Sequence, residues 1–132
     1  MRVEGLELTE RDDELFGFEK LEAWQLAAEF AHAVYALTKG FPREEMFGLT
    51  SQLRRASVSV GANIAEGTSR TSGKDQARFY EIAYGSLNEI VTMLRIAQRE
   101  SFVSQRQVET LRADAAKLCR MLSGLRRSAT DR

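Results

Sequence analysis

The residues of this chain that could do chemistry are few, and most of them lack the partners that the chemistry needs. Glu29 and His32 form one Glu-x-x-His pair, the spacing found in di-iron helix bundles, but such a site needs two of these pairs. His32 is the only histidine, so a second pair is impossible, and Cys119 with His32 gives too few ligands for a dedicated zinc site. We therefore expect no metal, and we expect Cys119 to be a small apolar neighbour of Leu118.

The segment from Gly67 to Asp75 resembles a phosphate-binding loop in composition only. Five residues separate Gly67 from Gly73 where a P-loop has four, and Asp75 occupies the position of the magnesium-binding Ser or Thr. No strand pattern precedes the segment, which excludes nucleotide hydrolysis. General acid–base catalysis by Glu66 and Glu89 is disfavoured because no nucleophile or ligand set accompanies them. The sequence predicts no catalytic residue, no cofactor and no enzyme.

Basic residues are the remaining candidates for a binding function. Arg70, Lys74 and Arg78 are four apart, so a helix would place them on one side near its start. A second group lies at spacings of eight and seven on the last predicted helix: Arg112, Arg120 and Arg127. A phosphate backbone is the matching partner for these six residues. The alternative is a solvated face whose cations pair with neighbouring acidic residues. Arg54 and Arg55 are set apart from these six as candidates for a subunit interface.

The charge of the chain is balanced in sum but uneven along its length. Residues 1–47 hold 5 Lys or Arg against 11 Asp or Glu, residues 48–100 hold 7 against 5, and residues 101–132 hold 7 against 3. This asymmetry indicates either a surface for nucleic acid or an acidic partner, or matching between an acidic first helix and a basic last helix. The composition does not separate the two.

Apolar residues repeat at helical spacing in four segments, which we expect to be helices over about 18–39, 48–66, 73–100 and 105–127. Ser72 and Ser104 are predicted N-caps, while Gly40 and Gly67 are predicted helix stops. The stripes of the first, second and last helices are Leu21, Trp24, Ala28, Ala31 and Tyr35; Leu49, Leu53, Ala56, Val60 and Ile64; and Val108, Leu111, Ala115, Leu118, Leu122 and Leu125. In the third helix Phe79 is expected in the core, with Tyr80 and Tyr84 outside.

These segments predict an all-α fold, an antiparallel up-and-down four-helix bundle without strands. Residues 1–17 are predicted to be an acidic, poorly ordered N-terminal arm, residues 18–127 the bundle, and residues 128–132 a C-terminal tail. The single cysteine and the lack of a long apolar run favour a cytoplasmic protein that does not contact a membrane.

Two polar residues at the end of the second helix, Asn63 and Glu66, are predicted to be structural. Buried polar groups without a partner cost about 1–3 kcal/mol each, so we expect both side chains to be hydrogen-bonded. Arg55, Tyr84 or Glu89 are the expected neighbours.

Several blocks of the sequence resemble the family of 23S rRNA intervening-sequence four-helix-bundle proteins. The blocks are residues 18–25, 41–45, 49–67, 78–80 and 85–89, and together the resemblance covers residues 18–125. The run ending in Asn63-Ile64-Ala65-Glu66-Gly67 is the most specific of them. Gly61 departs from the pattern, because the family often has Pro there.

The resemblance implies a bundle that assembles as a ring-like homopentamer, related in fold to the accessory variability determinant of diversity-generating retroelements. It brings no catalytic residues. Small residues and apolar stripes on more than one helix face also favour a homo-oligomer. We expect a non-enzymatic oligomeric binding protein that presents its basic residues to RNA or DNA. The alternative is a protein-only scaffold, whose arginines pair with acidic residues of a neighbour or of another protein.

Overall fold

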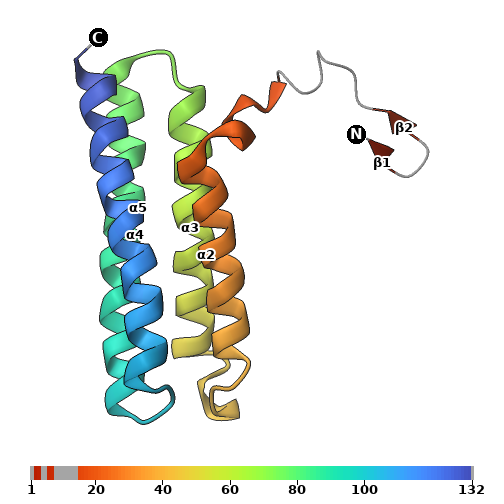
Figure 1. The fold of residues 1–132 in the computed structure, drawn as a ribbon, viewed down its shortest axis with the longest axis vertical. Coiled ribbons are helices and arrows are strands. Elements are labelled where there is room, and N and C mark those ends of the chain that lie inside the picture. The colour runs from red at the N-terminus through yellow and green to blue at the C-terminus, as the bar shows by residue number, and fades with distance from the viewer. Residues whose placement is uncertain (1, 4–5, 8–14, 132) are drawn as a thin grey trace.

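The fold is a bundle of four long helices, seen in a computed structural model that describes residues 2–3, 6–7 and 15–131 (Figure 1). The helices are α2 (Glu22–Thr38), α3 (Leu49–Ser69), α4 (Gly73–Arg99) and α5 (Gln105–Thr130). They run alternately up and down, each packs on the next along the chain, and α5 packs back on α2. The all-α antiparallel four-helix bundle predicted from the sequence is therefore confirmed.

Shorter elements flank the bundle. A single 3-10 turn, η1 (Gly17–Lys20), precedes α2, and another, η2 (Arg43–Glu45), lies between α2 and α3. The pattern predicted no strand, yet β1 (Arg2–Val3) pairs antiparallel with β2 (Leu6–Glu7). The other positions of the predicted arm before residue 15 lie outside the described residues, so the arm stays a prediction.

The helix N-termini follow the predicted capping. The Ser72 hydroxyl accepts a hydrogen bond from the Asp75 amide at 3.1 Å. Ser104 and Gln107 form a reciprocal capping box, with bonds of 3.1 and 2.9 Å. These contacts are local in sequence, which is why the spacing of the residues was enough to find them.

The core faces of α3 and α5 are the predicted ones, but the predicted face of α2 is wrong. Five buried residues form the real one: Ala23, Ala27, Phe30, Val34 and Thr38. The predicted stripe lies about a quarter turn away, on the flank near α3, where Ala28 is exposed and Tyr35 is 41% exposed. Because α2 carries two adjacent apolar stripes, its periodicity fits either face.

The predicted stop at Gly67 is also wrong, because α3 continues to Ser69 and Gly67 is buried within it. A Cβ at position 67 would lie 2.8 Å from Cε1 of Tyr80, so the glycine makes room for that ring. Tyr80 is accordingly 5% exposed, contrary to the prediction, whereas Tyr84 is 40% exposed as predicted. Phe79 is only half-buried.

A second close approach joins the start of α4 to the end of α5. A Cβ at position 73 would lie 2.0 Å from the carbonyl oxygen of Ala129, closer than any real contact. Ala129 is buried at this contact, and α5 extends to Thr130. The predicted tail, residues 128–132, therefore begins inside the helix.

Substituting Gly73 tests this contact. We expect Gly73→Ala to lower the free energy of unfolding by about 1–3 kcal/mol, the usual effect of overpacking. Gly124→Ala is the control: it lies within α5, and a Cβ there would meet nothing within 4 Å. The control should gain up to about 1 kcal/mol from helix propensity. Urea denaturation measures both, and equal stabilities would contradict the contact.

Candidate nucleic-acid interface

The turn between α3 and α4 holds the predicted basic residues nearest the loop. Arg70 follows α3 in an extended conformation, and its amide donates to the carbonyl oxygen of Gly67 at 3.2 Å. The side-chain amide of Gln76, a buried residue, donates to the Arg70 carbonyl oxygen at 3.0 Å. Ser72 caps α4. The turn is thus fixed from both helices, and it sets the direction in which Arg70 leaves the backbone.

Two arginines lie over one aromatic ring at this end of the bundle. The Arg70 and Arg78 guanidinium carbons are 4.8 and 4.5 Å from the centroid of the Phe79 ring. Such cation–π contacts hold the guanidinium groups in place over the ring. Arg70 also forms an exposed ion pair with Glu66. Sequence reasoning placed Phe79 in the core and missed its role as a support for the arginines.

Lys74 and Arg78 line a broad, open hollow of about 740 Å³ between the first turns of α4 and the last turn of α5. Gly73 and Ala129 form part of its floor, where the two backbones meet. Two carboxylates, of Asp75 and Glu81, line the same hollow, so its charge is mixed. The Glu81 carboxylate also forms a salt bridge with Arg126 on α5, with 3.5 Å between Oε1 and Nη1.

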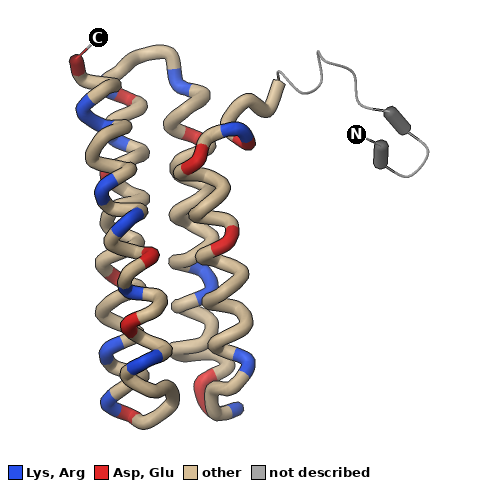
Figure 2. The backbone as a smooth tube through the Cα atoms, in the orientation of Figure 1, with Lys and Arg blue, Asp and Glu red and all other residues tan. Residues whose placement is uncertain are grey.

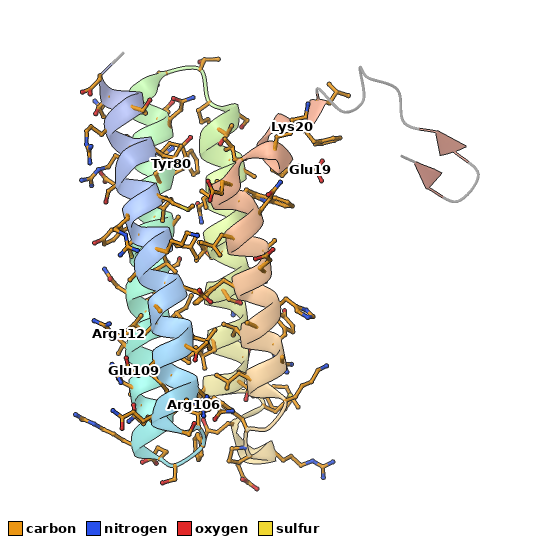
Figure 3. All side chains as sticks on the ribbon, viewed as in Figure 1. Glu19, Lys20, Tyr80, Arg106, Glu109 and Arg112 are labelled. Carbon is orange, nitrogen blue, oxygen red and sulfur yellow. The ribbon has the colours of Figure 1, made fainter. Side chains whose placement is uncertain are left out.

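The six predicted cations do not form one patch. Arg127, in the last turn of α5, lies at the same end as the Arg70–Lys74–Arg78 cluster, because the following Ala129 meets Gly73. Arg112 is about 22 Å away from Arg127 along α5, from the helical rise. Figure 3 accordingly places Arg112 toward the opposite end from Tyr80. Arg120 lies between them in sequence. The binding role of all six stays a prediction.

Charge is distributed unequally over the helices (Figure 2). Helix α5 carries six Lys or Arg against two Asp or Glu. Residues 56–65 of α3 carry no charge, although they complete nearly three turns and therefore include an outward side. On that side Val58 is 51% exposed and Ala62 is exposed as well.

Asn63 is hydrogen-bonded, but not to the partners that were expected. Its side-chain amide donates to the carbonyl oxygen and the hydroxyl of Ser59, at 2.9 and 3.0 Å. The Ser59 hydroxyl is in turn 3.0 Å from that of Ser86, which links α3 to α4. Arg55 and Glu89 line a hollow next to these two serines without bonding to Asn63.

Glu66 was predicted to be a structural residue with a hydrogen-bonded side chain, but it contributes less to the packing of the bundle than expected. Its side chain is 50% exposed, and its partner is Arg70 rather than Arg55, Tyr84 or Glu89. An exposed pair of this kind contributes at most about 1 kcal/mol. The structural role proposed for Glu66 is therefore reduced to holding Arg70.

Arg54, for which the sequence suggested an interface between subunits, is part of the contact between α2 and α3. Its Nε donates to the hydroxyl of Thr38 at 2.9 Å, and its guanidinium lies 4.8 Å from the Tyr35 ring centroid. Thr38 is buried and donates to the carbonyl oxygen of Val34 at 2.8 Å. The hydrogen bond between Arg54 and Thr38 joins positions sixteen residues apart. The sequence pattern around Thr38 therefore did not predict it.

Comparison with known proteins places the chain in a family. The family model described as 23S rRNA-intervening sequence protein matches residues 19–124. The chain belongs to this family. A solved structure, that of a protein with unknown function from the S23 ribosomal protein family of Bacteroides thetaiotaomicron, superposes with a TM-score of 0.70. It is 24% identical and covers 78% of this chain and 96% of its own, which supports the fold alone. No curated protein matches the chain.

Neither a cluster of metal-ligand side chains nor a membrane-spanning helix is found among the described residues of this family member. Within residues 15–131, no three His, Cys, Asp or Glu side chains gather in a way that could hold a metal ion. His32 is exposed on α2. None of the described helices is both long and apolar enough to cross a membrane.

Cys119 lies half-buried beside the bundle core, as expected for a small apolar neighbour. Burial raises the pKa of its thiol, and a hydrogen bond with Tyr84 and the charge of Arg120 oppose this only in part. A raised pKa leaves less thiolate at neutral pH, and the thiolate is the reactive form. The structure therefore argues against Cys119 as a nucleophile.

Alkylation of Cys119 measures this effect directly, because it is the only cysteine. We expect iodoacetamide to modify the folded protein more slowly at pH 7.5 than the urea-unfolded chain. The pH midpoint of the rate should lie higher in the folded state, so that the difference narrows as the pH rises through the raised pKa. Mass spectrometry gives the rates. A folded-state midpoint at or below that of the unfolded chain would show the pKa direction to be wrong.

Proposed function

We propose that this family member is a non-enzymatic, oligomeric binding protein, assembled as a pentameric ring, that presents a basic surface to RNA or DNA. The observation that carries the proposal is the cluster at the α3–α4 turn. Arg70 and Arg78 are held over Phe79, with Lys74 one turn from Arg78. Proteins that bind single-stranded nucleic acid combine positively charged side chains with aromatic rings on their binding surface, and this cluster has both.

Assembly is supported by the uncharged part of α3. A solvated helix face usually carries charged side chains, but residues 56–65 have none. A neighbouring subunit that covers Val58 and Ala62 would remove this apolar surface from water. Five subunits with three or four cations each would present about fifteen to twenty charges, and affinity rises with the number of phosphates contacted.

The competing function is a protein-only scaffold, and one observation favours it. Several arginines already have acidic partners within the subunit: Arg70 with Glu66, Arg95 with Glu109 at 2.8 Å, and Arg126 with Glu81. Cations that are paired in this way would also pair with acidic residues of another protein. The two functions differ in how binding to a polyanion responds to salt.

A salt titration of RNA binding tests the proposal. The family name refers to 23S rRNA, so a structured fragment of that RNA is the first probe, with single-stranded DNA as the second. We expect the affinity to fall steeply with salt. Arg70→Glu combined with Lys74→Glu should weaken binding and reduce the slope of log K against log salt by about 1 for each phosphate that the variant no longer binds.

The matched control reverses two cations at the other end of the bundle, Lys39→Glu with Arg106→Glu. It changes the net charge equally, so it should lower the affinity much less if the cluster is the binding site. Light scattering checks that both variants keep the wild-type mass. Absence of binding at low salt by an intact oligomer would favour the scaffold, and an equal decrease of affinity in the two variants would contradict the site.

A further inference from the structure

The connection between α2 and α3 exposes an aromatic side chain almost completely. Phe47 is 96% exposed and Met46 beside it 49%, which makes Phe47 the most exposed large apolar residue described. The same connection buries its other aromatic residue: Phe41 packs on Phe102, with ring centroids 5.7 Å apart. One aromatic ring anchors the connection to the core, and the other projects into solvent.

The exposed side chain stands on a well-ordered turn. The amides of Glu45, Met46 and Gly48 donate backbone hydrogen bonds of 3.0, 3.1 and 3.0 Å within the turn. The Glu45 carboxylate also accepts from the Leu49 amide at 3.1 Å, at the start of α3. A side chain presented by a rigid turn loses little conformational entropy when it binds, and exposed aromatic residues of this kind are common binding anchors.

A shallow, open hollow of about 320 Å³ lies on the C-terminal part of α4, and five residues of this one helix line it: Val91, Thr92, Arg95, Ile96 and Arg99. Val91 and Ile96 provide apolar surface, and Ile96 is 47% exposed. The C-terminal end of α4 and the α2–α3 connection lie at the same end of the bundle (Figure 1). In two neighbouring subunits whose bundle axes are parallel, the hollow of one and Phe47 of the other therefore lie at the same end of the assembly.

The two surfaces differ in the sign of their prevailing charge. The turn before Phe47 holds Arg43, Glu44 and Glu45, of which Arg43 and Glu44 are exposed, so it is acidic in sum. The hollow is lined by Arg95 and the exposed Arg99, with Glu100 next in sequence. Arg95 also lines the hollow but is held by Glu109 at 2.8 Å, which leaves Arg99 as the better partner for Glu44. Complementary charges at the edge of an apolar contact favour the correct partner and orientation.

We propose that Phe47 and Met46 of one subunit dock into the α4 hollow of a second copy of this chain. The contact joins two different surfaces, so repetition connects subunits head to tail and closes a ring if the rotation between them allows it. It lies at the end of the bundle away from Arg70, Lys74 and Arg78, which it leaves uncovered. The inference rests on the proposed oligomer and names surfaces that would hold it together.

Chemical cross-linking tests the contact. In a Cys119→Ala background, Phe47→Cys with Ile96→Cys should give covalent dimers, trimers and larger species with a short bis-maleimide. Each single cysteine variant should stay monomeric on a denaturing gel, because the contact brings together unlike positions. Dimers from Phe47→Cys alone, or no cross-linking of the double variant while light scattering shows an oligomer, would overturn the head-to-tail contact.

Light scattering of substituted chains gives a second test. Phe47→Asp and Ile96→Asp should each shift the mass toward the 14.9 kDa monomer while circular dichroism keeps its helical signal. The control is Leu15→Asp, 70% exposed at the other end of the bundle, which should keep the wild-type mass. Glu44→Arg and Arg99→Glu should each weaken assembly, and their combination should restore it.

The outcomes separate this contact from the proposed function. An unmodified chain that stays at 14.9 kDa at all concentrations would overturn both the oligomer and the contact. An oligomer that Phe47→Asp leaves unchanged would overturn the contact alone. RNA binding without any oligomer would preserve the basic site and remove the ring.

Discussion

The backbone contact between Gly73 and Ala129 is the constraint on which this end of the molecule depends. It brings the start of α4 against the end of α5 at a separation that no side chain permits. With the α4 N-terminus fixed there, Gln76 reaches back to the Arg70 carbonyl oxygen. The guanidinium groups of Arg70 and Arg78 then both lie over the Phe79 ring. The basic cluster is therefore a consequence of how closely the helices approach, as much as of the spacing of its cations.

Helix positions and caps could be predicted because they depend on neighbours in sequence. The capping box of Ser104 and the apolar face of α5 are examples, since both are defined by residues three or four apart. The face of α2 could not be predicted in this way. Its two apolar stripes are equally periodic, and contacts with α3 and α5 decide which stripe is buried. Tertiary packing settles a choice that local spacing leaves open.

The candidate site shows the same division. The spacing of Lys74 and Arg78 correctly put both on one side of α4, but Arg70 lies outside that helix. The partner of Asn63, Ser59, lies four residues earlier in the same helix, so the spacing contained this hydrogen bond although it was not predicted. The support of Arg70 by Phe79 could not be predicted, because it depends on how the turn between α3 and α4 folds back on α4. Gly67 looked like a helix stop because glycine ends many helices, whereas here it makes space for Tyr80.

The order of the helices has a consequence for how fast the chain folds. Three of the four helix pairs are neighbours in sequence, and only the less extensive α2–α5 pair joins distant segments. Most native contacts therefore close short loops, and such topologies fold on the microsecond-to-millisecond timescale. In the proposed oligomer, each subunit would therefore reach its native state before it meets another, and assembly would proceed from folded monomers.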